Sequence, residues 1–129
     1  MSKKLTITDL LARKEQLKKK KVRKQTLLVE SLDAEIVIQE PSRAIVTEAL
    51  EMSQDSTRSE MADIHVVYHS VVEPNLKDKE LQDAFGCVEP TDIVKFIFRD
   101  GEIGMISGLA VQLAGYGQGI SKVDREIKN

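Results

Sequence analysis

The sequence lacks tryptophan and contains only 4% aromatic residues, three prolines and a single cysteine, Cys87, among 129 residues. A lone cysteine cannot form an internal disulfide, which favours a reducing compartment such as the cytoplasm. No apolar run reaches the ~20 residues that span a bilayer, and the polar N-terminus lacks the apolar stretch of a secretory signal. These absences exclude disulfide scaffolds and membrane spans. They predict a single soluble domain with an aliphatic core.

Charged residues are abundant and unevenly placed. Residues 1–26 contain ten Lys or Arg and two acidic residues, a net charge of +8, whereas residues 27–129 contain nine basic and nineteen acidic residues, a net charge of −10. This asymmetry predicts a basic helix or mobile arm at 1–24 and a domain at 25–129. The arm could act as a solubilising segment, dock on an acidic surface or bind nucleic acid. The acidic body and the arm's lack of aromatic residues disfavour nucleic acid.

The arm itself has a weak helical pattern. Thr6 or Thr8 can cap a helix that runs to about Val22, with Asp9 in its first turn. The apolar stripe of this helix consists of Leu10, Leu11 and Leu17. Because so narrow a stripe does not hold a helix firmly, we expect the arm to be frayed or mobile.

Alternating apolar residues predict two strands, at 26–30 and 35–39, joined as an antiparallel hairpin. The link contains Asp33 followed by Ala34, where a tight primed turn would have glycine, so we expect a longer turn. A hairpin alone is marginally stable. This one must therefore pack on helices or pair with another chain.

The remainder is predicted to be helical. The expected helices begin at Ser42, span about 60–72 and 78–85, begin at Glu89–Asp92, and span about 101–114, with a flexible loop at 53–59. The helix after Ser42 has an apolar face formed by Ile45, Val46, Ala49 and Leu50, and the apolar face of the helix over 101–114 is formed by Ile103, Ile106, Leu109, Ala110 and Leu113. Segment 60–72 is apolar nearly all round and is predicted to be the central helix of the core. The fold class is therefore α+β: one mostly helical domain with one β-hairpin near the N-terminus.

Two residue types invite a chemical interpretation. His65 and His69 lie four apart, which places both on one helix face as metal ligands would lie, but a third ligand and the His-Glu-x-x-His motif are missing. Cys87 has no neighbouring base in the sequence and fits a small buried side chain better than a nucleophile. The sequence predicts no catalytic residues, no metal and no cofactor.

Glycines mark two further segments. Gly115, Gly117 and Gly119 follow a predicted helix, whereas phosphate loops precede one, so they fit a helix end better than a phosphate site. Gly104 and Gly108 have the spacing that lets two helices approach closely, either within the chain or in a complex.

Several stretches together resemble one family. They are TLLVESL at 26–32, IVIQEPSR at 36–43, VVEPNLKDKEL at 71–81, FGCVEPTDIV at 85–94, GEI at 101–103 and LAGYG at 113–117, after a lysine-rich start. The chain resembles, over about residues 3–128, the tail assembly chaperones of PBSX-like prophages and related long-tailed phages of Gram-positive bacteria. The stretches at 73–76 and 113–117 are the most specific.

The resemblance implies a non-enzymatic protein of the bacterial cytoplasm that acts during virion assembly and is not expected in the mature virion. Such proteins bind the tape measure protein, a long helical rod that is insoluble alone, and help to recruit tail tube subunits around it. The resemblance carries no catalytic residues to this chain. Self-association through the hairpin edge remains open.

We hypothesise that the arm contacts the client. The predicted partner-binding residues are Leu10, Leu11, Leu17, Lys18, Lys19, Lys20 and Lys21. The leucines would cover apolar client helices, and the lysines would attract acidic client segments. The alternatives are a structural component of the finished tail, a nucleic-acid-binding regulator that uses residues 13–24 and, more distantly, a small metal or thiol enzyme.

Overall fold

The alternating segments form the first two strands of a sheet. In the computed structural model, which describes residues 3–123, β1 (Lys24–Val29) and β2 (Ala34–Gln39) pair antiparallel with Leu27 opposite Ile36. The link is a 3-10 turn (Glu30–Leu32) followed by Asp33 in the left-handed conformation, with φ 49° and ψ 45°. The predicted hairpin and its longer turn are therefore confirmed.

A third strand extends the hairpin into a sheet. β3 (Val71–Glu73) pairs antiparallel with β2, which gives the strand order β1-β2-β3 and leaves β1 at one edge. The sequence-based helix over 60–72 was wrong at its end, because α4 (Met61–Ser70) stops before this strand. Periodicity does not separate a short buried strand from the last turn of a buried helix, and the β-branched Val71 and Val72 suit a strand.

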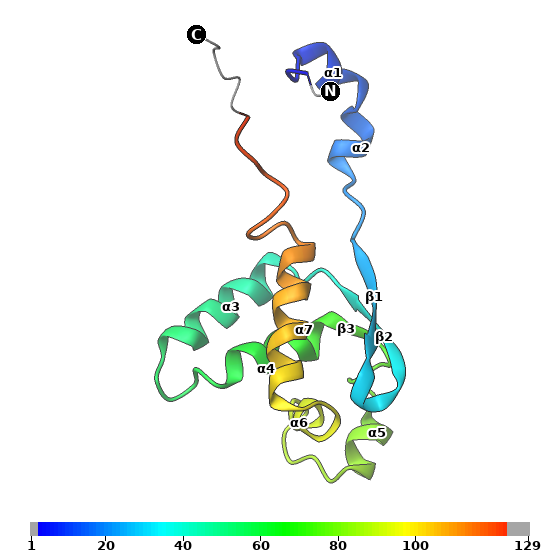
Figure 1. The fold of residues 1–129 in the computed structure, drawn as a ribbon, viewed down its shortest axis with the longest axis vertical. Coiled ribbons are helices and arrows are strands. Elements are labelled where there is room, and N and C mark those ends of the chain that lie inside the picture. Colours follow the sequence, from blue (N-terminus) through cyan, green and yellow to red (C-terminus); the bar gives the residue numbers. More distant parts are fainter. Residues whose placement is uncertain (1–2, 124–129) are drawn as a thin grey trace.

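Five helices form the body around the sheet. They are α3 (Arg43–Gln54), α4, α5 (Lys79–Ala84), α6 (Asp92–Ile97) and α7 (Asp100–Leu113). Ser42 caps α3 by accepting a hydrogen bond from the Ile45 backbone, as predicted. The α+β class is confirmed, with helices packed against a small antiparallel sheet (Figure 1).

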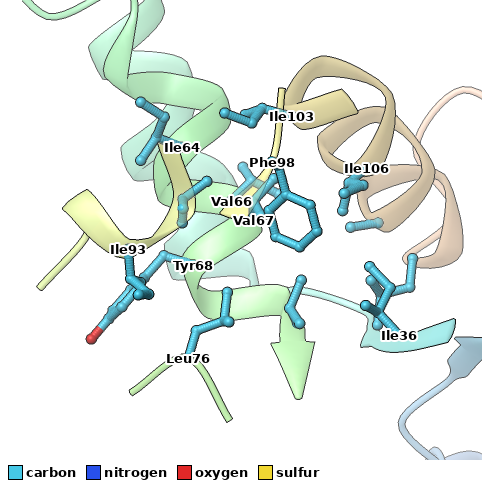
Figure 2. Packing of buried hydrophobic residues seen from close by; sticks show 14 of the residues in the cluster. Ile36, Ile64, Val66, Val67, Tyr68, Leu76, Ile93, Phe98, Ile103 and Ile106 are labelled. Carbon is cyan, nitrogen blue, oxygen red and sulfur yellow. The ribbon is translucent and has the colours of Figure 1, made fainter. Parts of the chain in front are cut away.

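The core lies where α4 meets α7, α6 and the sheet. Its buried apolar residues are Val29, Ile36, Ile38, Ile64, Val66, Val67, Tyr68, Val71, Leu76, Ile93, Val94, Phe98, Ile103, Ile106 and Ala110. α4 supplies Ile64, Val66, Val67 and Tyr68, which confirms it as the central helix. Figure 2 shows the ring of Phe98 pointing into this cluster.

Two residues expected on apolar inner faces lie outside the core. Leu50 of α3 is 59% exposed, and Leu109 of α7 is 40% exposed. α3 contributes no fully buried residue, because it packs on the body from one side and has no element over its other side. α7 turns Ile103, Ile106 and Ala110 inward and leaves Leu109 at the border of that face.

The arm, defined here as residues 3–23, is helical only in part. The predicted single helix to Val22 was wrong: α1 (Ile7–Ala12) and α2 (Lys14–Lys18) are separated at Arg13, and no helix continues past Lys18. The consecutive lysines 18–21 repel one another and add no apolar contact that would extend a helix. Thr6 caps α1 through a reciprocal pair of hydrogen bonds with Asp9. The arm rises in line with β1, away from the body helices (Figure 1).

Candidate functional site

The arm exposes several apolar side chains to solvent. The exposed fractions are 61% for Leu5, 76% for Ile7, 42% for Leu10, 67% for Leu11, 42% for Leu17 and 53% for Val22. Positions 7, 10 and 11 share one face of α1 at helical spacing, and Leu17 lies on α2, beyond the interruption at Arg13. The lysines at 18–21, which we predicted as partner-binding together with Leu10, Leu11 and Leu17, are exposed as well. The arm can therefore offer an apolar row followed by positive charge to another polypeptide.

A second apolar surface lies on the body between β1 and α7, here called the β1–α7 groove. Its lower part is lined by Leu27, Leu28, Val29, Glu30, Glu102, Met105, Ile106 and Leu109. Its upper part continues past Leu27 and Leu109 to Arg23, Gln112 and Leu113. Met105 is 70% exposed, so the lower part of the groove is open and mostly apolar, whereas Arg23, Gln25, Gln112 and Gln118 make the upper part polar.

Two contacts hold the walls of this groove together. At the lower end the Ser31 hydroxyl donates a hydrogen bond of 2.6 Å to Oε2 of Glu102, and the Arg99 backbone donates one of 2.8 Å to Oε1. These bonds stabilise the carboxylate and lower the pKa of Glu102. At the upper end the Arg23 guanidinium donates to the Leu113 carbonyl at 3.1 Å. The hairpin is thus tied to both ends of α7.

Sequence reasoning did not identify this groove. Leu28 was assigned to a strand, but no local pattern in the sequence indicates that this strand packs against α7. Met105 lies outside the apolar face predicted for its helix. An apolar residue on the polar side of an amphipathic helix is a signal in the sequence that could have indicated the groove.

The two histidines lie together on α4, as their spacing predicts. Their ring centroids are 4.7 Å apart, and Nε2 of His65 lies 2.9 Å from Oε1 of Glu48 on α3. Burial lowers the pKa of His69, and the neighbouring Lys77 and His65 lower it further. Among residues 3–123, no three His, Cys, Asp or Glu side chains are grouped so that they could hold a metal ion. The pair contributes a polar link between α3 and α4.

Cys87 sits in an environment that opposes thiolate formation. The side chain is half-buried after α5. Burial raises the pKa of its thiol, and the carboxylates of Asp92 and Asp83 raise it further. A nucleophilic cysteine has the reverse arrangement, with positive charge lowering the pKa. The geometry favours the structural interpretation of this residue.

The glycines have different roles in the two segments. Gly115 follows α7 with φ +95°, a conformation that closes the helix and that other residues rarely adopt. Gly104 and Gly108 lie on the exposed side of α7, where a Cβ would meet nothing within 4 Å. Within the described residues no other helix therefore packs against them, and neither glycine lines the groove.

The stretches at 73–76 and 113–117 have structural roles. Leu76 is fully buried. Gln82 of α5 donates one hydrogen bond to the Leu76 carbonyl at 2.9 Å and another to the Tyr68 hydroxyl at 3.3 Å. This network fixes the turn after β3 to the central helix. The stretch at 113–117 ends α7 beside the upper part of the groove.

The comparisons with known proteins agree with this architecture. The crystal structure of the protein yqbn has a similar fold, with a TM-score of 0.56 and 17% sequence identity over 76% of this chain and 89% of that chain. A comparison with curated proteins found no significant match. In the described part of the chain, no helix has the length and apolar character needed to cross a membrane.

The family comparison covers the arm helices and the body alike. The model described as "Phage XkdN-like tail assembly chaperone protein, TAC" matches residues 7–128. This range contains α1 and α2, the sheet and all the helices of the body. It also contains every residue predicted to bind a partner. The chain belongs to the Phage XkdN-like tail assembly chaperone family.

Proposed function

We propose that this tail assembly chaperone binds the tape measure protein and helps to recruit tail tube subunits around it, without catalysis, in the cytoplasm of the bacterial host. The observation that carries the proposal is the exposure of the arm's apolar side chains to solvent, whereas the apolar side chains of the core are buried. Exposed apolar residues in a contiguous row are typical of a surface that another polypeptide covers.

The arm's composition suits a helical client. A row formed by Leu10, Leu11 and Leu17 can pack against the apolar face of an amphipathic helix. The neighbouring lysines at 18–21 attract acidic segments and speed the encounter. In this proposal residues 1–24 form the client-binding arm, and residues 25–129 form the domain that carries it.

Co-expression with the tape measure protein of the same gene cluster tests the proposal. We expect a complex that co-elutes in size-exclusion chromatography, whereas the tape measure protein alone precipitates. The double variant Leu10→Asp/Leu17→Asp should lose the complex, because two carboxylates would have to be buried against an apolar helix. Leu50→Asp is the matched control, since Leu50 is 59% exposed on α3, outside the arm.

Two results would overturn the proposal. A client that still precipitates while the chaperone elutes alone would show that the chaperone does not bind it. Full binding by the double variant would show that the arm does not contact the client. Mass spectrometry of purified tails addresses the structural alternative: abundant chaperone in finished tails would favour a tail component over a transient assembly factor.

The exposed lysines at 18–21 keep nucleic acid as a testable second candidate. A nucleic-acid-binding arm predicts affinity for duplex DNA that falls steeply as salt concentration rises. Replacing these four lysines with glutamine would then abolish DNA binding. For the chaperone, the same variant should retain the tape measure complex through the leucines and form it more slowly.

A further inference from the structure

We propose that in the absence of a client the arm of one copy docks in the β1–α7 groove of a second copy, so that two chains exchange arms. This chain presents two uncovered apolar surfaces, one on the arm and one on the body. Exposure of these apolar side chains to water is unfavourable. The two surfaces have similar lengths, and both carry apolar side chains. The inference concerns the free chaperone and does not depend on the identity of its client.

Both surfaces have the exposure that docking requires. On the arm, Ile7 is 76% exposed and Leu11 is 67% exposed. In the groove, Met105 is 70% exposed and Leu109 is 40% exposed on the α7 wall, and Leu27 lies on the β1 wall. An amphipathic helix laid in the groove would cover these side chains and its own apolar face together, which is the usual geometry of a helix in an apolar groove.

The dimensions agree. Residues 7–18 of the arm would span about 18 Å as a helix, at ~1.5 Å per residue. The stretch of α7 that lines the groove, from Glu102 to Leu113, has the same number of residues and also spans about 18 Å.

Charge favours the same pairing. Residues 1–26 have a net charge of +8, and residues 27–129 have a net charge of −10. Glu30 and Glu102 lie at the lower end of the groove. The body therefore attracts the arm, whereas two bodies or two arms repel one another.

The occupant is a second copy because the arm points away from its own groove. It rises in line with β1 (Figure 1), and Arg23 at its base is held to the Leu113 carbonyl at the groove's upper end. Docking in its own groove would require the chain to reverse its direction within residues 19–22, immediately before the fixed Arg23. Reciprocal exchange between two copies fills both grooves and closes the assembly as a two-fold dimer.

Size-exclusion chromatography with light scattering, over a range of concentrations and without any client, tests the exchange. We expect the wild-type chain to be a dimer. The arm variant Ile7→Asp/Leu11→Asp and the groove variant Met105→Glu/Leu109→Glu should each weaken the dimer at least about tenfold. Circular dichroism checks that each variant keeps its fold. Leu50→Glu/Val88→Glu is the matched control, since these residues are 59% and 89% exposed outside both surfaces.

Mixing the two variants gives the most specific result. A mixed pair retains one intact arm and one intact groove, so it should form a heterodimer at a concentration where neither variant self-associates. A wild-type monomer at every concentration would overturn the proposal. So would a dimer that survives both double substitutions, because that dimer would be formed by another surface such as the β1 edge. Failure here would leave client binding untouched, since no client is present.

Discussion

The arm and the body of this protein are ordered by different forces. The body buries a contiguous cluster that includes Ile38, Leu76 and Ile93, none of which is exposed to solvent. The arm has no buried residue, and its two short helices are stabilised by their own hydrogen bonds and by the Thr6 cap. The body thus folds by removing apolar area from water, whereas the arm keeps its apolar area available.

This difference assigns different roles to similar residues. A buried leucine of the body such as Leu76 is part of the fold, whereas the exposed leucines of the arm are available for contact with another chain. An isolated helix of this length is marginal in water, so the arm gains most of its helical stability only when something packs on it. A chaperone that must release its client benefits from such a surface, because binding affects the arm and leaves the core unchanged.

The largest expected effect on stability is the difference between two leucine-to-alanine substitutions, one in the body and one in the arm. Leu76→Ala should lower the free energy of unfolding by about 2–5 kcal/mol, because it leaves a cavity in a fully buried site. Leu11→Ala should change it by less than about 0.5 kcal/mol, because Leu11 is 67% exposed. Urea denaturation followed by circular dichroism measures both. A large loss for Leu11→Ala would mean that the arm packs on the body of the same chain.

The next comparison concerns two helix caps. Ser42→Ala removes the side chain that caps α3 and should lower the global free energy of unfolding by about 1 kcal/mol. Thr6→Ala removes the cap of α1 and should lower only the helicity of residues 7–12. Amide exchange resolves the two effects. Equal loss of global stability in both variants would contradict the separation of arm from body.

The body was predictable where local pattern and burial coincide. Alternation over 35–39 identified β2, and the apolar character of 60–72 identified the central helix. β3 was missed because three residues carry too little periodicity, and because its partner β2 is far away in the sequence. The break at Arg13 was missed because its helix pattern is continuous and no tertiary contact corrects it.

The candidate site was predictable to a smaller degree. The arm residues could be named because an apolar stripe within a basic segment is a local pattern. The groove could not, because it depends on α7 lying beside an edge strand about 75 residues earlier in the chain, and local signals cannot predict such long-range packing. Leu109 shows the limit: helical spacing put it on the inner face, whereas the packing of β1 against α7 decides its exposure.

A smaller effect distinguishes two glycines of the α7 segment. Gly108→Ala should raise the free energy of unfolding by about 0.5–1 kcal/mol, because an added Cβ meets nothing within 4 Å and alanine favours a helix. Gly115→Ala should lower it by about 1 kcal/mol, because its φ of +95° is strained for alanine. Thermal denaturation measures both changes.

The smallest expected effect is a pH dependence at the junction of hairpin and α7. The pKa of Glu102 is lowered first by the Ser31 hydroxyl and then by the Arg99 backbone, so the folded state favours the charged carboxylate. Its stabilisation is therefore complete above the ordinary pKa of glutamate and is lost as pH falls through the lowered folded value. Glu102→Gln should be less stable than wild type at neutral pH and equally stable in acid, as denaturation at a series of pH values would show.

Ser31→Ala separates the contact from the charge. It leaves Glu102 ionised but removes the 2.6 Å hydrogen bond, so its stability difference from wild type should also shrink as the carboxylate is protonated. The double variant should cost less than the sum of the two single variants, because both remove the same interaction. Additive losses at neutral pH would mean that hairpin and α7 are not joined here. The lower wall of the groove would then be held by apolar packing alone, as the body is, and the polar contacts that tie β1 to α7 would reduce to the one made by Arg23.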